Sequence, residues 1–259
     1  MTPHPRDTVE TRPPEPRRIA LLSDVHGNLP AFEAVIEDVE SAGVEETWCL
    51  GDLVGYGAQP DECVALAAER CDLCLSGNHD LVVLGKLDIA DFSSSAATAA
   101  EWTREHMGRD GLDFLGRLEP LDTRRPIGLY HASPRDPVWE YVLSTWQAAL
   151  CIEAMDARVG AVGHSHVALY FRSDDGAEVV GQQASAGTEV DFSRGRWLIN
   201  PGGVGQPRDG DPRAAWLLLD LERRTASWRR VEYPIDEAAK AIEDAGLPIM
   251  LAQRLYTGQ

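Results

Sequence analysis

Residues 18–28, RIALLSDVHGN, join a short apolar run to a cluster of polar side chains. The apolar run has the length of a buried strand, and Asp24 and His26 follow where that strand would end. Asn28 can cap a helix whose first turn contains Pro30. A strand that passes through a polar loop into a helix is the start of a β-α-β unit, so this stretch predicts a parallel sheet.

The same alternation continues along the first third of the chain. Apolar side chains recur at helical spacing as far as Gly43, and residues 47–50 form a second predicted strand. Pro60 opens a second predicted helix that runs to about Arg70, and residues 71–76 form a third strand. This order of elements predicts a parallel sheet covered by helices.

Beyond residue 80 the pattern becomes helical and then changes to short strands. We expect helices over most of 80–118, a strand at 127–131, a helix at 145–155 and a strand at 158–162. Short alternating runs follow, at 167–172, 177–183, 187–192, 195–200, 214–220 and 226–232, and helices close the chain near 235–245 and 248–256. The sequence therefore predicts a parallel first half and an antiparallel second half.

Residues 1–16 differ in composition from the rest of the chain. They contain five prolines and almost no large apolar side chains, which predicts a disordered leader ahead of a single domain at 17–259. They lack the apolar core of a secretory signal, and no apolar run reaches the length of a membrane span. We therefore expect a protein with no membrane partner.

Charge and cysteine content indicate which binding partners and which cellular setting to expect. The formal net charge is −18, and this field repels long nucleic acids. The five cysteines are an odd count, which predicts reduced thiols and a cytoplasmic setting. Cys71 and Cys74 form one C-x-x-C pair without a second pair, so packing is a better interpretation than a structural zinc site.

Polar clusters stand at the ends of five predicted strands. Because ligands bind at the carboxyl edge of strands in open α/β sheets, these clusters should converge in space. Their carboxylate, amide and imidazole groups suit Mn, Fe, Zn or Mg. The residues are Asp24 and His26, then Asp52, then Asn78 and His79, then His131, and finally His164 and His166.

Each cluster alone is a weak indication. An Asp-x-His pair arises by chance, two histidines in His-x-His can share one face of a strand, and His131 can be a hydrogen-bonded structural histidine. Their combination in this order, each at a strand end, is what indicates a metal site.

The order D-x-H, G-D, G-N-H-D, H and G-H-S-H resembles that of the calcineurin-like metallophosphoesterase superfamily, and the match extends from Ile19 to about Asn200. Other stretches resemble a bacterial and archaeal branch of small metallophosphoesterases. These are SDVHGN at 23–28, GDLVGYG at 51–57, NPGGVGQPRDGDPR at 200–213 and GLPIMLAQRL at 246–255.

The resemblance implies a fold and a set of roles. The fold would be an α/β four-layer αββα sandwich with mixed sheets, and the cofactors would be two divalent metal ions, Mn or Fe before Zn or Mg. One ion would be held by Asp24, His26 and His166 and the other by Asn78, His131 and His164, with Asp52 bridging both. Asn78 and His79 would contact the phosphate. His79 would also protonate the leaving oxygen.

Phosphate esters resist hydroxide because both are negatively charged. Two metal ions about 3.5–4 Å apart lower the pKa of a bridging water to about 7 and neutralise the phosphate oxygens. Two carboxylates and one hydroxide would leave such a site with a charge of about +1, which attracts a small phosphate ester. His79 suits the role of general acid because the ordinary pKa of histidine lies near neutral pH.

The stretch after Asp52 departs from two related groups of enzymes. Protein serine/threonine phosphatases and dinucleoside tetraphosphatases carry a phosphate-binding arginine where this chain has Tyr56. Gly55 stands where the protein phosphatases have an acidic residue. The sequence therefore argues against both activities, and Tyr56 either lines the pocket or packs within its loop.

Two arginines of the 200–213 stretch are further candidates. Arg208 and Arg213 would reach substrate oxygens or, alternatively, pair on the surface with Asp209 and Asp211.

We expect metal-dependent hydrolysis of small phosphate esters by a metal-bridging hydroxide. A pocket poor in arginine favours diesters slightly. The alternatives are a phosphomonoesterase or nucleotidase, and a non-catalytic scaffold on the same fold. The sequence leaves the ester, the metal and the oligomeric state open.

Overall fold

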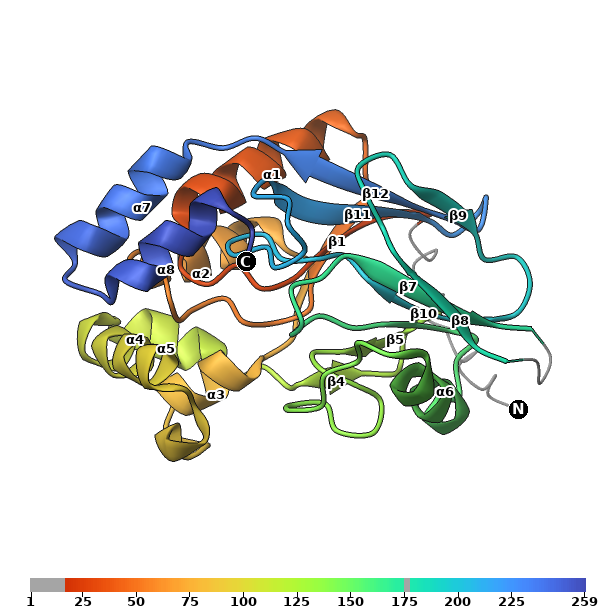
Figure 1. Cartoon of the computed structure of the whole chain (residues 1–259), viewed down its shortest axis with the longest axis horizontal. Coiled ribbons are helices and arrows are strands. Elements are labelled where there is room, and N and C mark those ends of the chain that lie inside the picture. Colours follow the sequence, from red (N-terminus) through yellow and green to blue (C-terminus); the bar gives the residue numbers. More distant parts are fainter. Residues whose placement is uncertain (1–16, 175–177) are drawn as a thin grey trace, which may run out of the picture.

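The computed structural model describes residues 17–174 and 178–259, so the leader predicted at 1–16 lies outside the described residues. The described chain forms two six-stranded sheets with helices on their outer faces (Figure 1). Three separate hydrophobic clusters fill the spaces between these layers. The arrangement is the four-layer αββα sandwich that the resemblance implied.

The first sheet has the strand order β3-β2-β1-β11-β12-β9. Its three N-terminal strands are parallel, and β11 runs antiparallel to β1. Their bounds are β1 (Arg18–Leu22), β2 (Glu46–Cys49), β3 (Leu73–Cys74), β9 (Glu189–Asp191), β11 (Ala214–Asp220) and β12 (Thr225–Val231). Leu21 in β1 and Leu217 in β11 illustrate how apolar positions pair in this sheet.

The second sheet has the order β4-β5-β6-β10-β7-β8. Strands β5, β6 and β10 are parallel, and the outer pairs are antiparallel. Their bounds are β4 (Leu121–Asp122), β5 (Gly128–Tyr130), β6 (Val159–Ala161), β7 (Leu169–Ser173), β8 (Val180–Gln183) and β10 (Arg196–Asn200). Residue 177, the first of the strand predicted at 177–183, lies outside the described residues.

Helices cover both outer faces. Helices α1 (Leu29–Ser41), α2 (Pro60–Arg70) and α7 (Ile235–Asp244) pack on the first sheet, and α6 (Thr145–Ala154) packs on the second (Figure 1). A further group lies to one side, with α3 (Asn78–Val83), η1 (Ile89–Asp91), α4 (Ser94–His106) and α5 (Arg109–Leu115). The chain closes with α8 (Ile249–Gln253) and η2 (Arg254–Tyr256).

The start of α1 forms as its sequence predicts. The Asn28 side chain accepts a hydrogen bond from the backbone N–H of Ala31, at 3.2 Å, and Pro30 occupies the first turn. Phe32, with its neighbours at helical spacing, is buried against the first sheet. The cap therefore fixes where the chain leaves the loop that carries Asp24 and His26.

The prediction of a parallel first half and an antiparallel second half was confirmed for the strands that it named. The early strands pair parallel, β2 with β1 and β3, and β5 with β6, and the late strands pair antiparallel with one another. The late strands are divided between the two sheets, because β9, β11 and β12 extend the first sheet while β7, β8 and β10 belong to the second. Alternating apolar residues show which side of a strand is buried, but they do not specify its partner. Both sheets are consequently mixed.

Among the residues that the structure describes, no helix has the length and apolar character that crossing a membrane requires.

Candidate metal centre

The predicted site residues come together at one edge of the sandwich. They follow β1, β2, β3, β5 and β6, in loops or, for Asn78 and His79, in the first turn of α3, so that both sheets contribute. Every one of these side chains is buried, with at most 4% of its surface exposed. They are Asp24, His26, Asp52, Asn78, His79, His131, His164 and His166.

The backbone of these loops adopts a conformation that L-residues rarely use. Seven non-glycine residues of the described chain have a φ near +60°, and six of them belong to this site. Each costs on the order of 1–3 kcal/mol, and such strain persists where the surrounding structure enforces it. The six are Asp24, His26, Asp52, Tyr56, His164 and His166.

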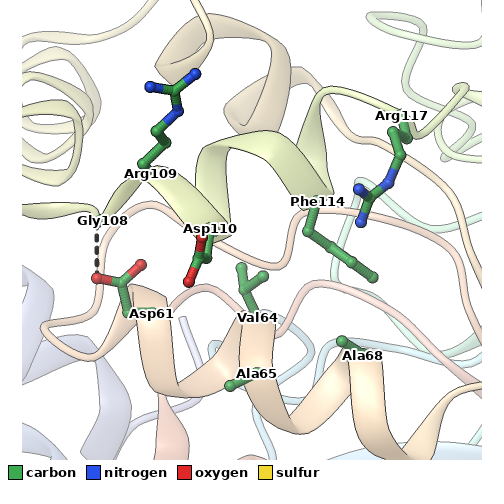
Figure 2. A pocket seen from close by; sticks show the side chains of 10 residues that line it. Asp61, Val64, Ala65, Ala68, Gly108, Arg109, Asp110, Phe114 and Arg117 are labelled. Carbon is green, nitrogen blue, oxygen red and sulfur yellow. Dashed lines mark hydrogen bonds between the residues drawn. The ribbon is translucent and has the colours of Figure 1, made fainter.

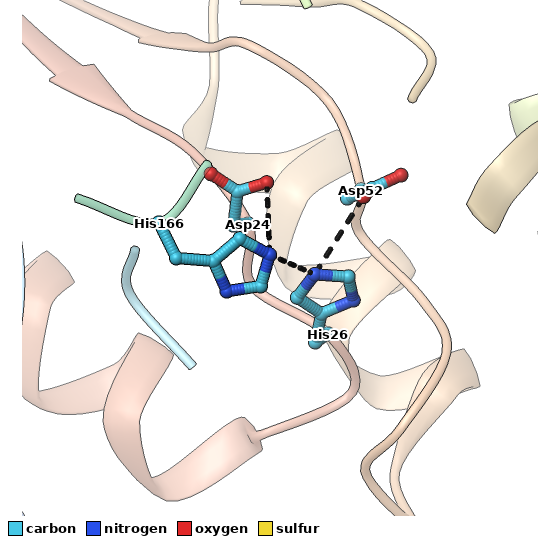
Figure 3. Close-up of side chains that lie close together, drawn as sticks. All are labelled: Asp24, His26, Asp52 and His166. Atoms are coloured by element: carbon cyan, nitrogen blue, oxygen red, sulfur yellow. Dashed lines mark hydrogen bonds and ion pairs between the residues drawn. The ribbon is translucent and has the colours of Figure 1, made fainter. Parts of the chain in front are cut away.

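One group of donors surrounds a point beside β1. Ligand atoms of Asp24, His26, Asp52 and His166 all lie within 4.8 Å of one another. The Nε2 atoms of His26 and His166 are 3.1 Å apart, and His26 Nε2 lies 3.6 Å from Asp52 Oδ2 (Figure 3). His166 Nε2 lies 3.6 Å from Asp24 Oδ1. Four donors at this spacing suit one transition-metal ion.

A second group shares Asp52. Donor atoms of Asp52, His131 and His164 also lie within 4.8 Å of one another. His131 Nε2 is 3.5 Å from Asp52 Oδ2 and 3.2 Å from Asn78 Oδ1. This division agrees with the one that the resemblance implied, and Asp52 is common to both groups.

Several ligand atoms have no hydrogen-bond partner among the described residues. They include Asp24 Oδ2, Asp52 Oδ2 and His164 Nε2, all of them buried. Because an unpaired buried polar atom costs free energy, such a convergence needs a binding partner. Two divalent metal ions fit these residues, since carboxylate oxygens and imidazole nitrogens are ligands for them.

The opposite ring nitrogens orient the histidines. Nδ1 of His26 donates to the carbonyl of Val54 at 3.0 Å, and Nδ1 of His131 donates to the carbonyl of Leu50 at 2.9 Å. A carbonyl only accepts, so each Nδ1 carries the proton and each Nε2 presents a lone pair. Such support fixes both the tautomer and the ring plane of a metal ligand.

The pKa values of the buried donor groups also favour a bound cation. Burial raises the pKa of Asp24 to about 7 and raises that of Asp52 well above its usual range. Burial also lowers the pKa of His26 and His166 far below that of free histidine, which keeps both rings neutral. A bound cation would reverse the first effect, because it stabilises the ionised carboxylates.

Comparisons with known proteins settle the family. Residues 18–224 match the model of the calcineurin-like phosphoesterase superfamily domain. The chain belongs to this superfamily. It is therefore a phosphoesterase of a metal-dependent family, as its sequence predicted. An uncharacterised protein of Methanocaldococcus jannaschii is 36% identical over 93% of this chain and 98% of its own length.

Solved structures agree with this placement. The crystal structure of a metallophosphoesterase from Sphaerobacter thermophilus is 39% identical, with a TM-score of 0.86 over 95% of this chain and all of that one. A hypothetical protein from Pyrococcus horikoshii is 20% identical, with a TM-score of 0.75 over 93% of this chain and 98% of that one. This second likeness concerns the fold alone.

Asp80 is a supporting residue of this phosphoesterase that the sequence analysis did not assign. Its buried carboxylate accepts hydrogen bonds from three backbone N–H groups, those of Gly77 at 2.8 Å, Asp52 at 2.9 Å and Val54 at 3.2 Å. The loops after β2 and β3 are therefore tied to one side chain. The G-N-H-D motif contained the signal, because an acid in the first turn of a helix often binds backbone N–H groups.

His79 lies beside the two groups of candidate metal-binding donors and belongs to neither of them. Its backbone N–H donates to Asp52 Oδ1 at 2.9 Å, while its ring packs 4.4 Å from Tyr56 and 4.8 Å from His26. A Cβ on Gly55, whose φ is +88°, would lie 2.4 Å from His79 Nδ1. Glycine at the position where protein phosphatases carry an acid therefore makes room for this ring.

Tyr56 and Arg208 line a pocket of about 300 Å³ that opens above the metal groups. The Arg208 guanidinium lies 5.6 Å from the centre of the Tyr56 ring, and its Nη2 donates to the tyrosine oxygen at 3.3 Å. Tyr56 therefore lines the pocket. Arg213 does not line it, because it pairs with Asp211, as the surface alternative supposed.

Several residues of this pocket were missed by the sequence analysis. Its wall includes the rings of Phe92, Trp139 and Tyr141, and a second arginine, Arg254, lies at its rim. The premise of a pocket poor in arginine was wrong, because one cation comes from the 200–213 stretch and the other from the C-terminal one. No local motif marks either the rings or Arg254.

A larger pocket of about 550 Å³ lies between α2 and α5 (Figure 2). It shares no lining residue with the pocket beside the candidate metal-binding donors. Asp61 there accepts a hydrogen bond from the backbone N–H of Gly108 at 2.8 Å, and Arg109 points away from α2. The lining is mainly Val64, small side chains and Phe114. Size does not make it the active site, because it lacks the converging donor groups that the smaller pocket has.

Proposed function

We propose that this chain hydrolyses small phosphate esters with two divalent metal ions. The observation that carries the proposal is Asp52 Oδ2, which is buried, has no hydrogen-bond partner among the described residues, and lies 3.6 Å from His26 Nε2 and 3.5 Å from His131 Nε2. One carboxylate oxygen facing two histidine groups is the arrangement that a bridging ligand needs. When bound, the metals would supply an activated water and neutralise phosphate charge.

The chain itself would bind and orient the ester. Asp24, His26 and His166 would hold one ion, and Asn78, His131 and His164 the other. Asn78 would also face the phosphate. Arg208, held by Tyr56, would bind a phosphate oxygen and so replace the arginine that protein phosphatases carry after the bridging aspartate.

His79 would deliver a proton to the leaving oxygen. In the metal-free protein, burial first and the charge of Arg208 second lower its pKa well below the usual value, so it is neutral. A phosphate bound beside the ring would oppose both effects, because its negative charge favours the protonated imidazole. General-acid work by His79 would therefore begin when substrate binds.

A monoesterase or nucleotidase is the second candidate. It is favoured by Arg208 and Arg254, because two cations suit the doubly charged phosphate of a monoester better than the single charge of a diester. The metal mechanism is the same for both substrate classes.

The test is a screen of the purified protein after metal removal and after reloading with Mn, Fe, Zn or Mg. We expect metal-dependent turnover of nitrophenyl and bis-nitrophenyl phosphate, then of cyclic and linear nucleotides, with metal content near two ions per chain. Turnover of duplex DNA or of a phosphoserine protein well above every small ester would overturn the proposal. So would activity that is unchanged by chelation.

A further inference from the structure

Two stretches that are far apart in the sequence meet at the rim of the metal-site pocket. They are the loop at 200–213 and the C-terminal segment at 246–259. The backbone N–H of Gly210 donates to the carbonyl of Gly258 at 2.9 Å, which ties the two together. This contact brings Arg254, the first residue of η2, to the pocket that Arg208 also lines.

One buried glutamine holds both arginines. Gln206 Oε1 accepts from Arg208 Nη2 at 3.1 Å and from Arg254 Nη1 at 3.2 Å. The backbone carbonyl of the same Gln206 accepts from Nδ1 of His166 at 2.6 Å. The two guanidinium groups are therefore fixed side by side, and their common support also orients a predicted metal ligand.

No acidic side chain neutralises the charges of this pair. Within residues 17–174 and 178–259 neither guanidinium pairs with an aspartate or glutamate, since Asp209 pairs with Arg230 and Asp211 pairs with Arg213. This is unusual in a chain with 42 acidic and 24 basic residues. Arg254 Nε donates to the main-chain oxygen of Gln259 at 2.8 Å, and its Nη1 faces Gln206. Two adjacent guanidinium groups repel each other, so an arrangement that holds them together suits a ligand with negative charge.

The state of each side chain supports this interpretation. Nε of Arg208 is buried and has no hydrogen-bond partner among the described residues. Burial, and secondly the charge of Arg208, lower the pKa of Arg254. An anion at the rim would supply the missing acceptor and would relieve the repulsion.

The two arginines differ in their contacts with the candidate metal site. Arg208 lies over Tyr56, whose ring is 4.6 Å from His26 and 4.4 Å from His79. Arg254 lines the same pocket beside Arg208, since both donate to Gln206 Oε1. A phosphate bound at the predicted metal ions would therefore meet Arg208 first, and further negative charge of the same substrate would meet Arg254.

We propose that Arg254, together with Arg208, forms a subsite for a second negative charge of the substrate, and that Arg254 determines specificity for it. The proposal rests on the phosphoesterase function proposed above. That charge would be either the second ionised oxygen of a phosphate monoester or a neighbouring phosphate group, as in a nucleoside diphosphate.

The test compares substrates that differ by one charge. Nitrophenyl phosphate and methyl nitrophenyl phosphate have the same leaving group but carry two charges and one. If the subsite binds the second charge of the scissile phosphate, we expect Arg254→Gln to lower kcat/KM for the first about 10–100-fold, mainly through KM, and to change the second less than about threefold. Arg254→Lys should keep most of the preference. Arg109→Gln, which removes an exposed charge that does not line the pocket of Arg208 and Arg254, should leave both substrates unaffected.

A second pair of substrates distinguishes the source of the charge. If the subsite binds a neighbouring phosphate, Arg254→Gln will reduce kcat/KM for a nucleoside diphosphate more than for the monophosphate, measured as phosphate release. If it binds the scissile monoester phosphate, both will fall equally.

Outcomes that overturn the subsite are separate from failure of the function itself. Equal losses on the one-charge and two-charge nitrophenyl substrates and on the nucleoside diphosphate and monophosphate, with unchanged melting temperature and metal content, would show that Arg254 has no role in charge selection. A folded Arg254→Gln variant that keeps the wild-type preference in both pairs of substrates would do the same. A wild-type protein without metal-dependent turnover of any ester would refute the proposed function instead.

Discussion

Among the described residues, the ring of His79 is held by packing against other rings. It contacts Tyr56 and Phe92, each with ring centres 4.4 Å away, and Nδ1 has no hydrogen-bond partner among the described residues. A histidine that served only structure would satisfy its buried nitrogen. The unpaired Nδ1 beside the pocket therefore favours a role for His79 in exchanging a proton with a ligand.

We predict that His79→Asn keeps the metals but lowers the rate for substrates with poor leaving groups. Loss of a general acid costs about 10²–10⁴-fold, and the loss should shrink for nitrophenolate, which leaves without a proton. The measurement is kcat for phenyl and nitrophenyl esters together with metal content. Equal loss for both esters would contradict the acid role, and loss of metal would make His79 a ligand.

At this scale the sequence predicts the donor groups that could hold metal ions better than it predicts the pocket wall. Asp24 and Asp52 were identifiable because each follows an apolar strand within a short motif, and strand ends converge for a reason of topology. Arg254 and Trp139 lie in the pocket because distant segments fold back onto it. No local pattern records such tertiary contacts, so a single sequence cannot show them.

The loops after β2 and β3 behave as one element because Asp80 joins them. Its three backbone acceptor contacts hold Asp52 and the start of α3 in one arrangement. A Cβ on Gly77 would lie 2.0 Å from Asp52 Oδ1, so these loops approach more closely than any other residue at 77 would permit. Loop geometry here depends on Asp80 as much as on the strands.

We predict that Asp80→Asn destabilises the metal-free protein by about 1–3 kcal/mol and weakens metal binding. An amide offers one acceptor oxygen where the carboxylate offers two, so at least one backbone N–H loses its partner. Urea unfolding and metal titration measure the two effects. Asp61→Asn is the matched control, because Asp61 also lies in a first helical turn but accepts from one backbone N–H, that of Gly108.

A result in which both variants lose the same stability, with unchanged metal affinity for Asp80→Asn, would contradict this role. It would show that the Asp80 contacts do not shape the site.

Helices were predicted more accurately than strands, for a physical reason. Helix α2 begins at Pro60 and ends at Arg70 as expected, because local residues determine where a helix starts and stops. Strand β3 is two residues long where six were expected, and β4 was not foreseen. Strands need partners from elsewhere in the chain, so their length and sheet depend on contacts that a local pattern does not contain.

At the level of the whole molecule, the two sheets are held together in two ways. Trp48 of the first sheet and Ile199 of the second belong to one buried apolar cluster between the sheets. At the edge of the sandwich, Asp24 and Asp52 from the first sheet face three histidines from the second, which are His131, His164 and His166. Metal binding should therefore stabilise the packing of one sheet on the other.

We predict that metal addition raises the melting temperature and that Asp52→Asn abolishes most of this increase. A ligand at 100 times its dissociation constant stabilises the folded state by about 2.7 kcal/mol per site, and Asp52 is shared by both sites. Without metal, Asp52→Asn should be as stable as the wild type or more so. Its Oδ1 still accepts from the His79 N–H, and the buried carboxylate with a raised pKa is gone.

Thermal unfolding with and without Mn measures both parts of this prediction, and Asp61→Asn should show the full metal effect. The opposite pattern would have two parts. The metal-free Asp52→Asn protein would be less stable than the wild type, and its melting temperature would still rise as much with metal. Asp52 would then support the fold and would not be the shared ligand. Two-metal binding would then need a different bridge. Asp24 Oδ2 would be the remaining carboxylate oxygen of these two donor groups that is buried without a hydrogen-bond partner among the described residues.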